Sequence, residues 1–357
     1  MLQSLADRRR TAALLRQLKQ RHAEKITEEL LQKNPSWLER FGEVARTRGI
    51  EDTAYHIDFL ASAVEAGSPE AFREYARWTT RMLAARGMEP RLLAESFLQI
   101  AESLSGDLDE EAAEAVQGLI EAGAAECTAD AVDQIDPRER MNDLQSTYLQ
   151  AILGGQRRAA REIALEAIDS GLGLEDLYGD VLQPCMYAVG ELWETNRISV
   201  ADEHMATAIT QAVMAEVYQR VPWNEDPRGN VVLTGVQGEL HQVGPHLVAD
   251  MLDIRGWNVR FLGANVPHRD VLQAVAEHEA EVLGISATVL FNTEFAMDII
   301  EQARDRFGDD LRIVVGGAAF RLRPELSFEM GADACGLNLQ EAICCFEEVA
   351  TDAQDPG

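Results

Sequence analysis

Glu239 and His241 stand two positions apart in the stretch TGVQGELHQVG, residues 234–244, which follows a short apolar run. A carboxylate that holds one ring nitrogen of a histidine orients the imidazole and makes the other nitrogen a stronger metal ligand. Leu240 lies between the two residues, and Gly244 would let the backbone pass close to a bulky ligand. The pattern ExHxxG predicts a metal-ligating imidazole, with a solvated surface pair as the ordinary alternative.

Two further stretches combine small and hydroxyl-bearing residues. The first is ISATV, which contains Ser286, Thr288 and Val289, and the second is VVGGAAF, which contains Gly316 and Gly317. A serine hydroxyl can donate a hydrogen bond into a cleft. A glycine pair removes side chains where the tail of a ligand would enter, although turns use glycine as well. In order along the chain, ExHxxG, SxT and GG predict one ligand site.

The elements that must position these loops alternate between two periodicities. Short β-branched runs are followed by helical patterns: strands at 231–233, 259–261, 282–285 and 313–315, and helices at 245–255, 268–278, 293–307 and 339–350. Such alternation is typical of a parallel, doubly wound α/β sheet. Ligands bind at the carboxyl ends of such strands, where we expect the three loops to meet.

These loops resemble those of the cobalamin-binding domains of methionine synthase and its relatives, whose signature is DxHxxG, SxL and GG. The resemblance implies that His241 replaces the cofactor's own base as the lower cobalt ligand. It also implies that Ser286, Gly316 and Gly317 line the channel for the displaced nucleotide tail. Glu239 stands where Asp is usual and Thr288 where Leu is common, so the tail contacts depart from the family pattern.

A second helical block precedes the sheet, with helices expected at 141–153, 156–170, 174–195 and 199–220. Four helices joined by short loops predict a small antiparallel bundle. Met186, Val189, Gly190 and Trp193 recur at three- and four-residue steps and so share one helix face. For Met186 and Val189 core packing is the ordinary explanation of this stripe.

Trp193 lies near the end of the third helix of the bundle, while Glu203 and His204 lie at the start of the fourth. An antiparallel turn would bring the three to one end of the bundle, where an indole could stack and Glu and His could hydrogen-bond an adenosyl group. The alternative is that the pair caps a helix start. The arrangement is similar to that of adenosylcobalamin-dependent photoreceptors. Glu194 follows the Trp, where the DNA-binding members carry a cobalt-capturing His.

Residues 1–126 show only helical periodicity. The stretch 51–83 is similar to the globin-like domain of the photocobilins, which bind cobalamin and biliverdin. On that resemblance, a bilin would meet side chains that offer guanidinium, aromatic and imidazole groups: Tyr55, His56, Arg73, Arg77, Trp78 and Arg81. The alternative is an arginine ridge paired with Glu70 and Glu74 in solvent. The stretch 1–126 has no Cys, so a bilin within it would be noncovalent unless Cys127 or a later thiol reaches it.

Composition limits the class of partner. A formal charge of −29 disfavours electrostatic binding to nucleic acid or anionic membranes. There is no signal core and no long uncharged apolar run, and the five cysteines are typical of reduced thiols. We therefore expect a cytoplasmic protein without a nucleic-acid or membrane partner.

The sequence thus predicts an all-α domain over 1–130, a four-helix bundle over 140–222 and a Rossmann-like α/β domain over 228–351. The resemblances imply that the first is a globin-like sensor domain and that the last binds cobalamin, with the bundle over its upper face. The resemblance implies a nonenzymatic light sensor that binds adenosylcobalamin, with a second, bilin chromophore. Loss of the adenosyl group in light would change the assembly of the chain or its contact with a separate effector protein. The alternative is a corrinoid methyl carrier that works with a methyltransferase in trans.

Overall fold

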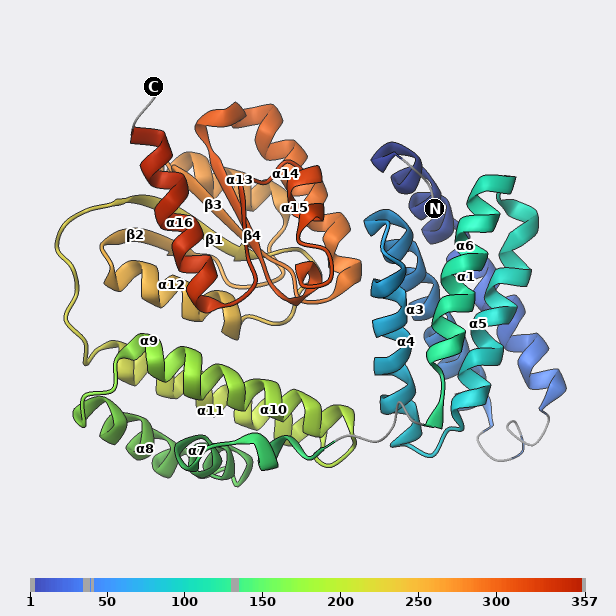
Figure 1. Ribbon diagram of the computed structural model, residues 1–357, viewed down its shortest axis with the longest axis horizontal. Coiled ribbons are helices and arrows are strands. Elements are labelled where there is room, and N and C mark those ends of the chain that lie inside the picture. Colours follow the sequence, from blue (N-terminus) through green and yellow to red (C-terminus); the bar gives the residue numbers. More distant parts are fainter. Residues whose placement is uncertain (1–3, 35–38, 40–41, 130–134, 355–357) are drawn as a thin grey trace. The chain divides into compact units, whose positions relative to one another are not determined.

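The computed structural model describes residues 4–34, 39, 42–129 and 135–354 of the chain (Figure 1). The chain divides into two compact units, Met1–Gln134 and Ile135–Gly357. Both ends predicted for the first domain, residues 1 and 130, lie outside the described residues. None of the helices in the described ranges is long and apolar enough to span a membrane.

The first unit contains helices throughout its described part: α1 (Leu5–Lys33), α3 (Glu43–Ala66), α4 (Pro69–Ala84), α5 (Pro90–Leu104) and α6 (Glu110–Glu126), with the 3₁₀ turn η1 (Ser105–Asp107). Ser68 caps α4 by accepting a hydrogen bond from the Ala71 N–H, with Pro69 in the first turn. Large apolar side chains such as Leu60, Phe72 and Phe97 are fully buried between the helices. The all-helical prediction is confirmed here, whereas the globin-like topology stays a prediction.

The second unit begins with the 3₁₀ turn η3 (Pro137–Arg140) and a helical bundle made of α7 (Asp143–Leu153), α8 (Arg157–Asp169), α9 (Leu174–Asp176), η4 (Leu177–Leu182), α10 (Gln183–Glu194) and α11 (Val200–Tyr218). The four helices begin and end close to the predicted residues. One difference is η4, which is a π-helical segment inside the third predicted helix. Such segments occur often at functional sites.

A five-stranded parallel sheet follows, in the order β2-β1-β3-β4-β5. Its strands are β1 (Gly229–Gly235), β2 (Trp257–Phe261), β3 (Val282–Ser286), β4 (Arg312–Gly316) and β5 (Ala334–Gly336). The helices are α12 (Val243–Ile254), α13 (His268–Glu277), α14 (Thr293–Phe307), α15 (Glu325–Glu329) and α16 (Leu339–Gln354), with 3₁₀ turns η5 (Leu290–Asn292), η6 (Gly308–Asp310) and η7 (Ala318–Phe320). The parallel α/β prediction is confirmed. β5 and α15, which are only three and five residues long, were not predicted from the sequence.

The register of the strands aligns their carboxyl ends. Gly235 pairs with Ser286, which in turn pairs with Gly316. The loops that follow β1, β3 and β4 therefore start at one edge of the sheet, as predicted. The order of the strands changes direction between β1 and β3, and such switch points are where ligands bind in open α/β sheets.

The bundle and the sheet share one apolar core. Leu247 and Met251 of α12 and Ile343 of α16 pack with Leu177 and Val181 of the bundle. Figure 1 shows α12 and α16 on the side of the sheet that faces the bundle, with α13 and α14 on the opposite side. The loop that leads into α12 is thereby placed beside the bundle.

Polar contacts reinforce this junction. The Tyr178 hydroxyl donates to Asp250 Oδ2 at 2.8 Å, and the Arg255 guanidinium donates to Glu175 at 2.5 Å. Tyr178 is fully buried and comes from η4, while Asp250 comes from α12. The π-helical segment therefore places a hydroxyl where the bundle meets the sheet.

Candidate cofactor site

Glu239 is buried in the loop after β1, and its carboxylate accepts hydrogen bonds on both oxygens. Its Oε1 accepts from Leu240 N and His241 N, each at 3.0 Å, and from His241 Nδ1 at 2.5 Å. Its Oε2 accepts from Thr288 N at 2.7 Å and from Asn292 Nδ2 at 3.0 Å. Burial by itself would raise the pKa of Glu239, but the hydrogen bonds from His241 and from Thr288 N hold it at about 2. The carboxylate is therefore ionised at neutral pH.

His241 presents its second ring nitrogen to the outside of the loop. Because the ionised Glu239 can only accept, Nδ1 of His241 is the donor, and in the neutral ring Nε2 carries the lone pair. The His241 side chain is 61% exposed, in contrast to the fully buried Glu239. The Glu239 hydrogen bond raises the pKa of His241, and the charge of Glu203 adds to this. The solvated-surface-pair alternative is therefore wrong for Glu239.

The glycines of the site fall into two groups. A Cβ on Gly317, whose φ is +105°, would lie 2.2 Å from the Ala287 carbonyl oxygen, and one on Gly316 would lie 2.7 Å from the Gly336 carbonyl oxygen. The packing of the sheet thus already requires glycine at both positions. By contrast, nothing lies within 4 Å of a Cβ built on Gly190 or Gly244. Internal packing therefore does not require glycine at positions 190 and 244. A bulky ligand lying against these positions would require it.

The residues at the end of β3 and after it have structural roles that differ from the predicted ones. Thr288 contributes its backbone N–H to Glu239, so its side chain is not the contacting group. Ser286 is buried at the end of β3 and is not among the groups that hydrogen-bond Glu239. Val289 lies in the same loop and is half-buried, while Leu240 in the loop after β1 is 79% exposed. The tail channel at Ser286, Gly316 and Gly317 stays a prediction.

Two of the predicted bundle contacts pack into the core instead. Val189 is fully buried in the core shared by bundle and sheet, and Met186 is half-buried against it. The core explanation is therefore correct for Val189, which has no surface to offer a ligand. Gly190, the next residue, is partly exposed on α10.

The end of the bundle that carries Trp193 is the end near the His241 loop. Trp193 is half-buried in the last turn of α10, while Glu203 and the exposed His204 lie in the first turns of α11. Glu203 lies close enough to His241 for its charge to raise the pKa of that histidine. Glu194, beside Trp193, is buried.

The capping alternative for Glu203 and His204 is wrong. Ser199 and Asp202 form the capping box of α11, which leaves Glu203 outside the cap. Glu203 instead accepts from Thr207 Oγ1 at 3.1 Å and from His204 Nδ1. Its carboxylate is held at the helix start by neighbours on α11 itself.

The arginines predicted to meet bilin propionates are engaged by carboxylates. Arg77 donates to Glu74 at 2.7 Å, to Glu70 at 2.8 Å and to Glu126 of α6 at 3.0 Å. Arg73 pairs with Glu70 at 3.2 Å, and Arg81 lies 3.8 Å from Glu74. The ridge is therefore an ion-pair network, as in the alternative explanation.

The remaining predicted bilin contacts do not form one face. Tyr55 is 56% exposed, whereas His56 is buried and hydrogen-bonds the Tyr75 hydroxyl at 2.6 Å. Trp78 lies beside Tyr75, with 6.1 Å between ring centroids. Adjacent residues of a helix point in different directions, which separates Tyr55 from His56.

Asn292 is the site residue that the sequence analysis missed. It lies 53 positions from Glu239 and belongs to none of the three loop motifs, so only the fold brings the two together. A second missed contact joins the sheet to the bundle: Arg321, just after η7, donates to the Tyr187 hydroxyl of α10 at 2.6 Å.

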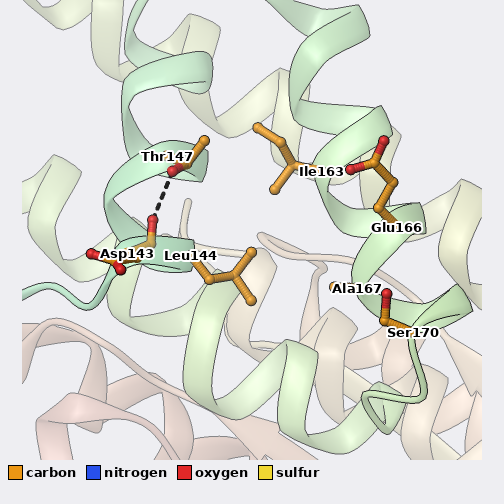
Figure 2. A pocket seen from close by; sticks show the side chains of 7 residues that line it. All are labelled: Asp143, Leu144, Thr147, Ile163, Glu166, Ala167 and Ser170. Carbon is orange, nitrogen blue, oxygen red and sulfur yellow. Dashed lines mark hydrogen bonds between the residues drawn. The ribbon is translucent and has the colours of Figure 1, made fainter.

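A separate hollow lies between α7 and α8 of the bundle (Figure 2), and the side chains that line it are Asp143, Leu144, Thr147, Ile163, Glu166, Ala167 and Ser170. It contains no imidazole or thiol, and Thr147 Oγ1 is turned to the Asp143 carbonyl oxygen at 2.7 Å. The hollow is not part of the loop site.

The arrangement around His241 fits one kind of metal centre. A single imidazole is too few ligands to hold a free transition metal, but a metal inside a macrocycle leaves an axial position for one such ligand. Nε2 of His241 is exposed for this role, and Glu239 holds the ring. A Cβ at Gly190 or Gly244 would meet no atom within 4 Å, so internal packing does not close either position to a ligand.

Comparison with known proteins points the same way. Residues 229–343 match one family model described as a B12 binding domain, and residues 144–218 match a second with the same description. The dimethylamine corrinoid protein 3 of Methanosarcina acetivorans is 26% identical over 194 residues, which are 53% of this chain and 90% of that protein. The HTH-type transcriptional repressor CarH of Myxococcus xanthus is 27% identical over 211 residues, 59% of this chain and 69% of that protein.

Among solved structures, the monomethylamine corrinoid protein of Methanosarcina barkeri is similar in fold, with a TM-score of 0.53 and 23% identity. The match covers 58% of this chain and 98% of that chain. The two B12 binding domains lie in the second compact unit, and the site built around His241 is within it. Residues 144–343 are therefore a paired B12-binding region, through which the protein binds a cobalamin.

Proposed function

We propose that the chain holds cobalamin with the cofactor's own base displaced and with Nε2 of His241 as the lower cobalt ligand. The observation that carries this proposal is the buried, ionised Glu239 bound to an exposed His241 at the carboxyl edge of the sheet. When bound, cobalamin would supply a cobalt–carbon bond. The protein's own part is to orient the imidazole, hold the Nδ1 proton on Glu239 and exclude water with the bundle.

For the use of this cofactor, we propose first that the chain is a corrinoid methyl carrier acting with a methyltransferase in trans. Support comes from relatives named as methylamine corrinoid proteins, of which this chain matches 85–96% of the length in five cases. A carrier needs the bundle to uncover the upper face of the corrin for its enzyme partner. The polar junction of Tyr178 with Asp250 would then keep the two domains attached during opening.

The second candidate is the adenosylcobalamin light sensor. Its support is the similarity to the repressor CarH, together with Glu203, whose charge reaches His241 and which binds His204. These side chains could hydrogen-bond an adenosyl group, and Trp193 could stack on it. Light that removes this group would remove the contacts and shift the balance between two arrangements of bundle and sheet. In this role the chain would act without an enzymatic step of its own.

A bilin in the first unit belongs to the second candidate. Arg73, Arg77 and Arg81 would have to leave their carboxylate partners to bind two propionates. Titration of the full chain with biliverdin tests this: a red-absorbing complex that Arg81→Ala weakens supports the bilin, and an unchanged biliverdin spectrum rejects it.

One reconstitution separates the proposals. The full chain is loaded in the dark with adenosylcobalamin or with methylcobalamin, its absorption spectrum is recorded, and its elution volume is measured before and after illumination. A spectrum of cobalamin with its base displaced and a histidine on cobalt supports the binding mode in both cases. A light-dependent elution change only with adenosylcobalamin supports the sensor, and an unchanged elution volume supports the carrier. A spectrum with the native base on cobalt rejects both.

A further inference from the structure

The segment that leads into α10 is fixed to the sheet domain by buried contacts. Leu177 of η4 packs in one apolar core with Ile343 of α16. Arg255, just after α12, adds paired charges, because its guanidinium donates to Glu175 of the bundle at 2.5 Å and to Glu347 of α16 at 2.8 Å. Separating the bundle from the sheet at this end would expose apolar surface to water, so this end stays attached.

Arg321 and Tyr187 join the bundle to the sheet domain by a contact of a different kind. The Tyr187 hydroxyl accepts a hydrogen bond from Arg321 Nη2 at 2.6 Å, and the guanidinium carbon lies 5.1 Å from the centre of the Tyr187 ring. Tyr187 is 47% exposed, and Arg321 is exposed as well. Because water competes with an exposed contact of this kind, it shifts an equilibrium by only about 2- to 5-fold. Thermal motion can therefore break it while the apolar core stays intact.

The contact acts on the part of α10 that leads to the cofactor site. Tyr187 lies inside α10, Gly190 follows three residues later with no atom within 4 Å of a Cβ built on it, and Trp193 lies in the last turn. Arg321 follows η7 in the loop after β4. That loop starts at the same edge of the sheet as the loop of His241. Arg321 therefore holds α10 from the edge of the sheet at which the site lies.

We propose that Arg321 and Tyr187 form a latch that holds the bundle closed over the cofactor site and so sets how fast cobalamin enters and leaves. The inference rests on the proposed placement of cobalamin between bundle and sheet, and it applies to the carrier and the sensor alike. Opening breaks this contact, whereas the buried contacts before α10 persist and act as the hinge. Loss of the latch raises the fraction of open molecules by the factor that the contact contributes.

Two single variants and their combination test the latch in the full chain. Arg321→Met removes the guanidinium and keeps a long side chain, whereas Tyr187→Leu removes the ring and its hydroxyl. Association of adenosylcobalamin is followed by its absorption in the dark, and dissociation by exchange for excess methylcobalamin. We expect each single variant to raise both rate constants by about 2- to 5-fold. The Kd should stay unchanged, because the latch closes in the same way over an empty and an occupied site.

Arg306→Met is the matched control. The Arg306 guanidinium carbon lies 5.0 Å from the centre of the Phe307 ring within α14, on the side of the sheet opposite to the bundle (Figure 1). This variant removes the same charge and the same kind of contact without touching the junction, so its rate constants should equal those of the wild type. The double variant of Arg321 and Tyr187 should match the faster single variant, because the two partners of one contact are not additive.

Three results would overturn the latch. Rate constants of Arg321→Met within about 1.5-fold of those of Arg306→Met would show that the contact does not control access. Additive effects of the two substitutions would show that the side chains act separately. A higher Kd with an unchanged association rate would show that they touch the cofactor instead. A wild-type chain with the native base on cobalt rejects His241 as the ligand, and the comparison of rates then still decides the latch.

Discussion

The Nδ1–H of His241 donates to Oε1 of Glu239 across 2.5 Å, and this contact leaves Nε2 of the same ring with its lone pair. Replacing His241 with Gln removes that nitrogen. We expect the variant to bind cobalamin at least 10-fold more weakly, with the histidine signature lost from the absorption spectrum. Equilibrium dialysis and spectroscopy of the full chain measure both.

His278→Gln is the matched control, because His278 is a second histidine of the same domain and its Nε2 contacts the Asn258 carbonyl oxygen at 2.8 Å. It should bind like the wild type. Equal cobalamin spectra in the two variants would show that His241 is not the ligand.

Replacing Gly190 should raise the thermal stability of the protein and lower its affinity for cobalamin. Gly190 lies inside α10 with open space where a Cβ would be, and glycine inside a helix costs about 0.5–1 kcal/mol relative to alanine. Gly190→Leu should therefore raise the melting temperature without cofactor, yet lower cobalamin affinity, because the new side chain occupies the space left for the corrin.

The control for Gly190 is Gly118→Leu. Gly118 lies inside α6 of the first unit, also with open space around its Cβ position. Calorimetry should show stabilisation in both variants, and isothermal titration should show weaker cobalamin binding in Gly190→Leu alone. Undiminished binding in Gly190→Leu would remove the corrin from this face of α10.

Because His56 is buried, we expect the first unit to lose stability in acid. Burial lowers the pKa of His56 from 6.5 to about 4. Between these two pKa values, His56 is protonated in the unfolded chain but neutral in the folded chain. The free energy of unfolding therefore falls as the pH drops from about 6.5 to about 4, and then levels off. The shift corresponds to a loss of about 3 kcal/mol at most. Hydrogen exchange of the α3 and α4 amides in the full chain, measured across this pH range, reports it.

His56→Gln should be less stable at pH 7, because the hydrogen bond of His56 with Tyr75 is altered, but its stability should depend less on pH. The same slope in variant and wild type would assign the acid sensitivity to another group.

Tyr178→Phe tests the junction of bundle and sheet. Its hydroxyl donates to Asp250, whose pKa burial raises and this hydrogen bond lowers. Without the hydroxyl, the partly buried Asp250 carboxylate loses a donor, and we expect a loss of about 1–3 kcal/mol of the free energy of unfolding in urea. Tyr187→Phe, whose more exposed hydroxyl accepts from Arg321, should cost within about 0.5 kcal/mol. Equal losses would contradict a special role for the buried contact.

Glu203→Gln separates the two proposed uses of the cofactor. A sensor uses the carboxylate to hold the adenosyl group, so the variant should bind adenosylcobalamin several-fold more weakly and methylcobalamin unchanged. Glu162→Gln, at an exposed ion pair with Arg158 on α8, serves as control. Equal affinities of wild type and Glu203→Gln for adenosylcobalamin would argue against the sensor.

The order of the elements could be predicted because hydrophobic periodicity is local. The apolar runs at 231–233 and 282–285 lie within the observed β1 and β3, and the four bundle helices begin and end near their predicted residues. Short elements such as β5 contain too few residues for a period to be recognised. The Glu239–His241 pair was found because both partners lie in one loop.

Other features depended on residues far apart in the chain. From the sequence, Arg77 was a candidate ligand for a propionate. In the structure its Nε donates at 3.0 Å to Oε2 of Glu126, which lies on α6, 49 positions away. The backbone of Ala287 requires glycine at position 317, so this glycine by itself is no evidence for or against the predicted ligand channel.

The amino-acid sequence alone determined where helices and strands form, and which histidine has a carboxylate at hand, because those properties depend on neighbours within a few positions. Only the tertiary structure decided that Asn292 holds Glu239 and that the charge of Glu203 reaches His241. Such contacts depend on strand register and on the packing of the bundle against α12. Both are set by the burial of apolar surface over the whole unit, which no single stretch of sequence contains.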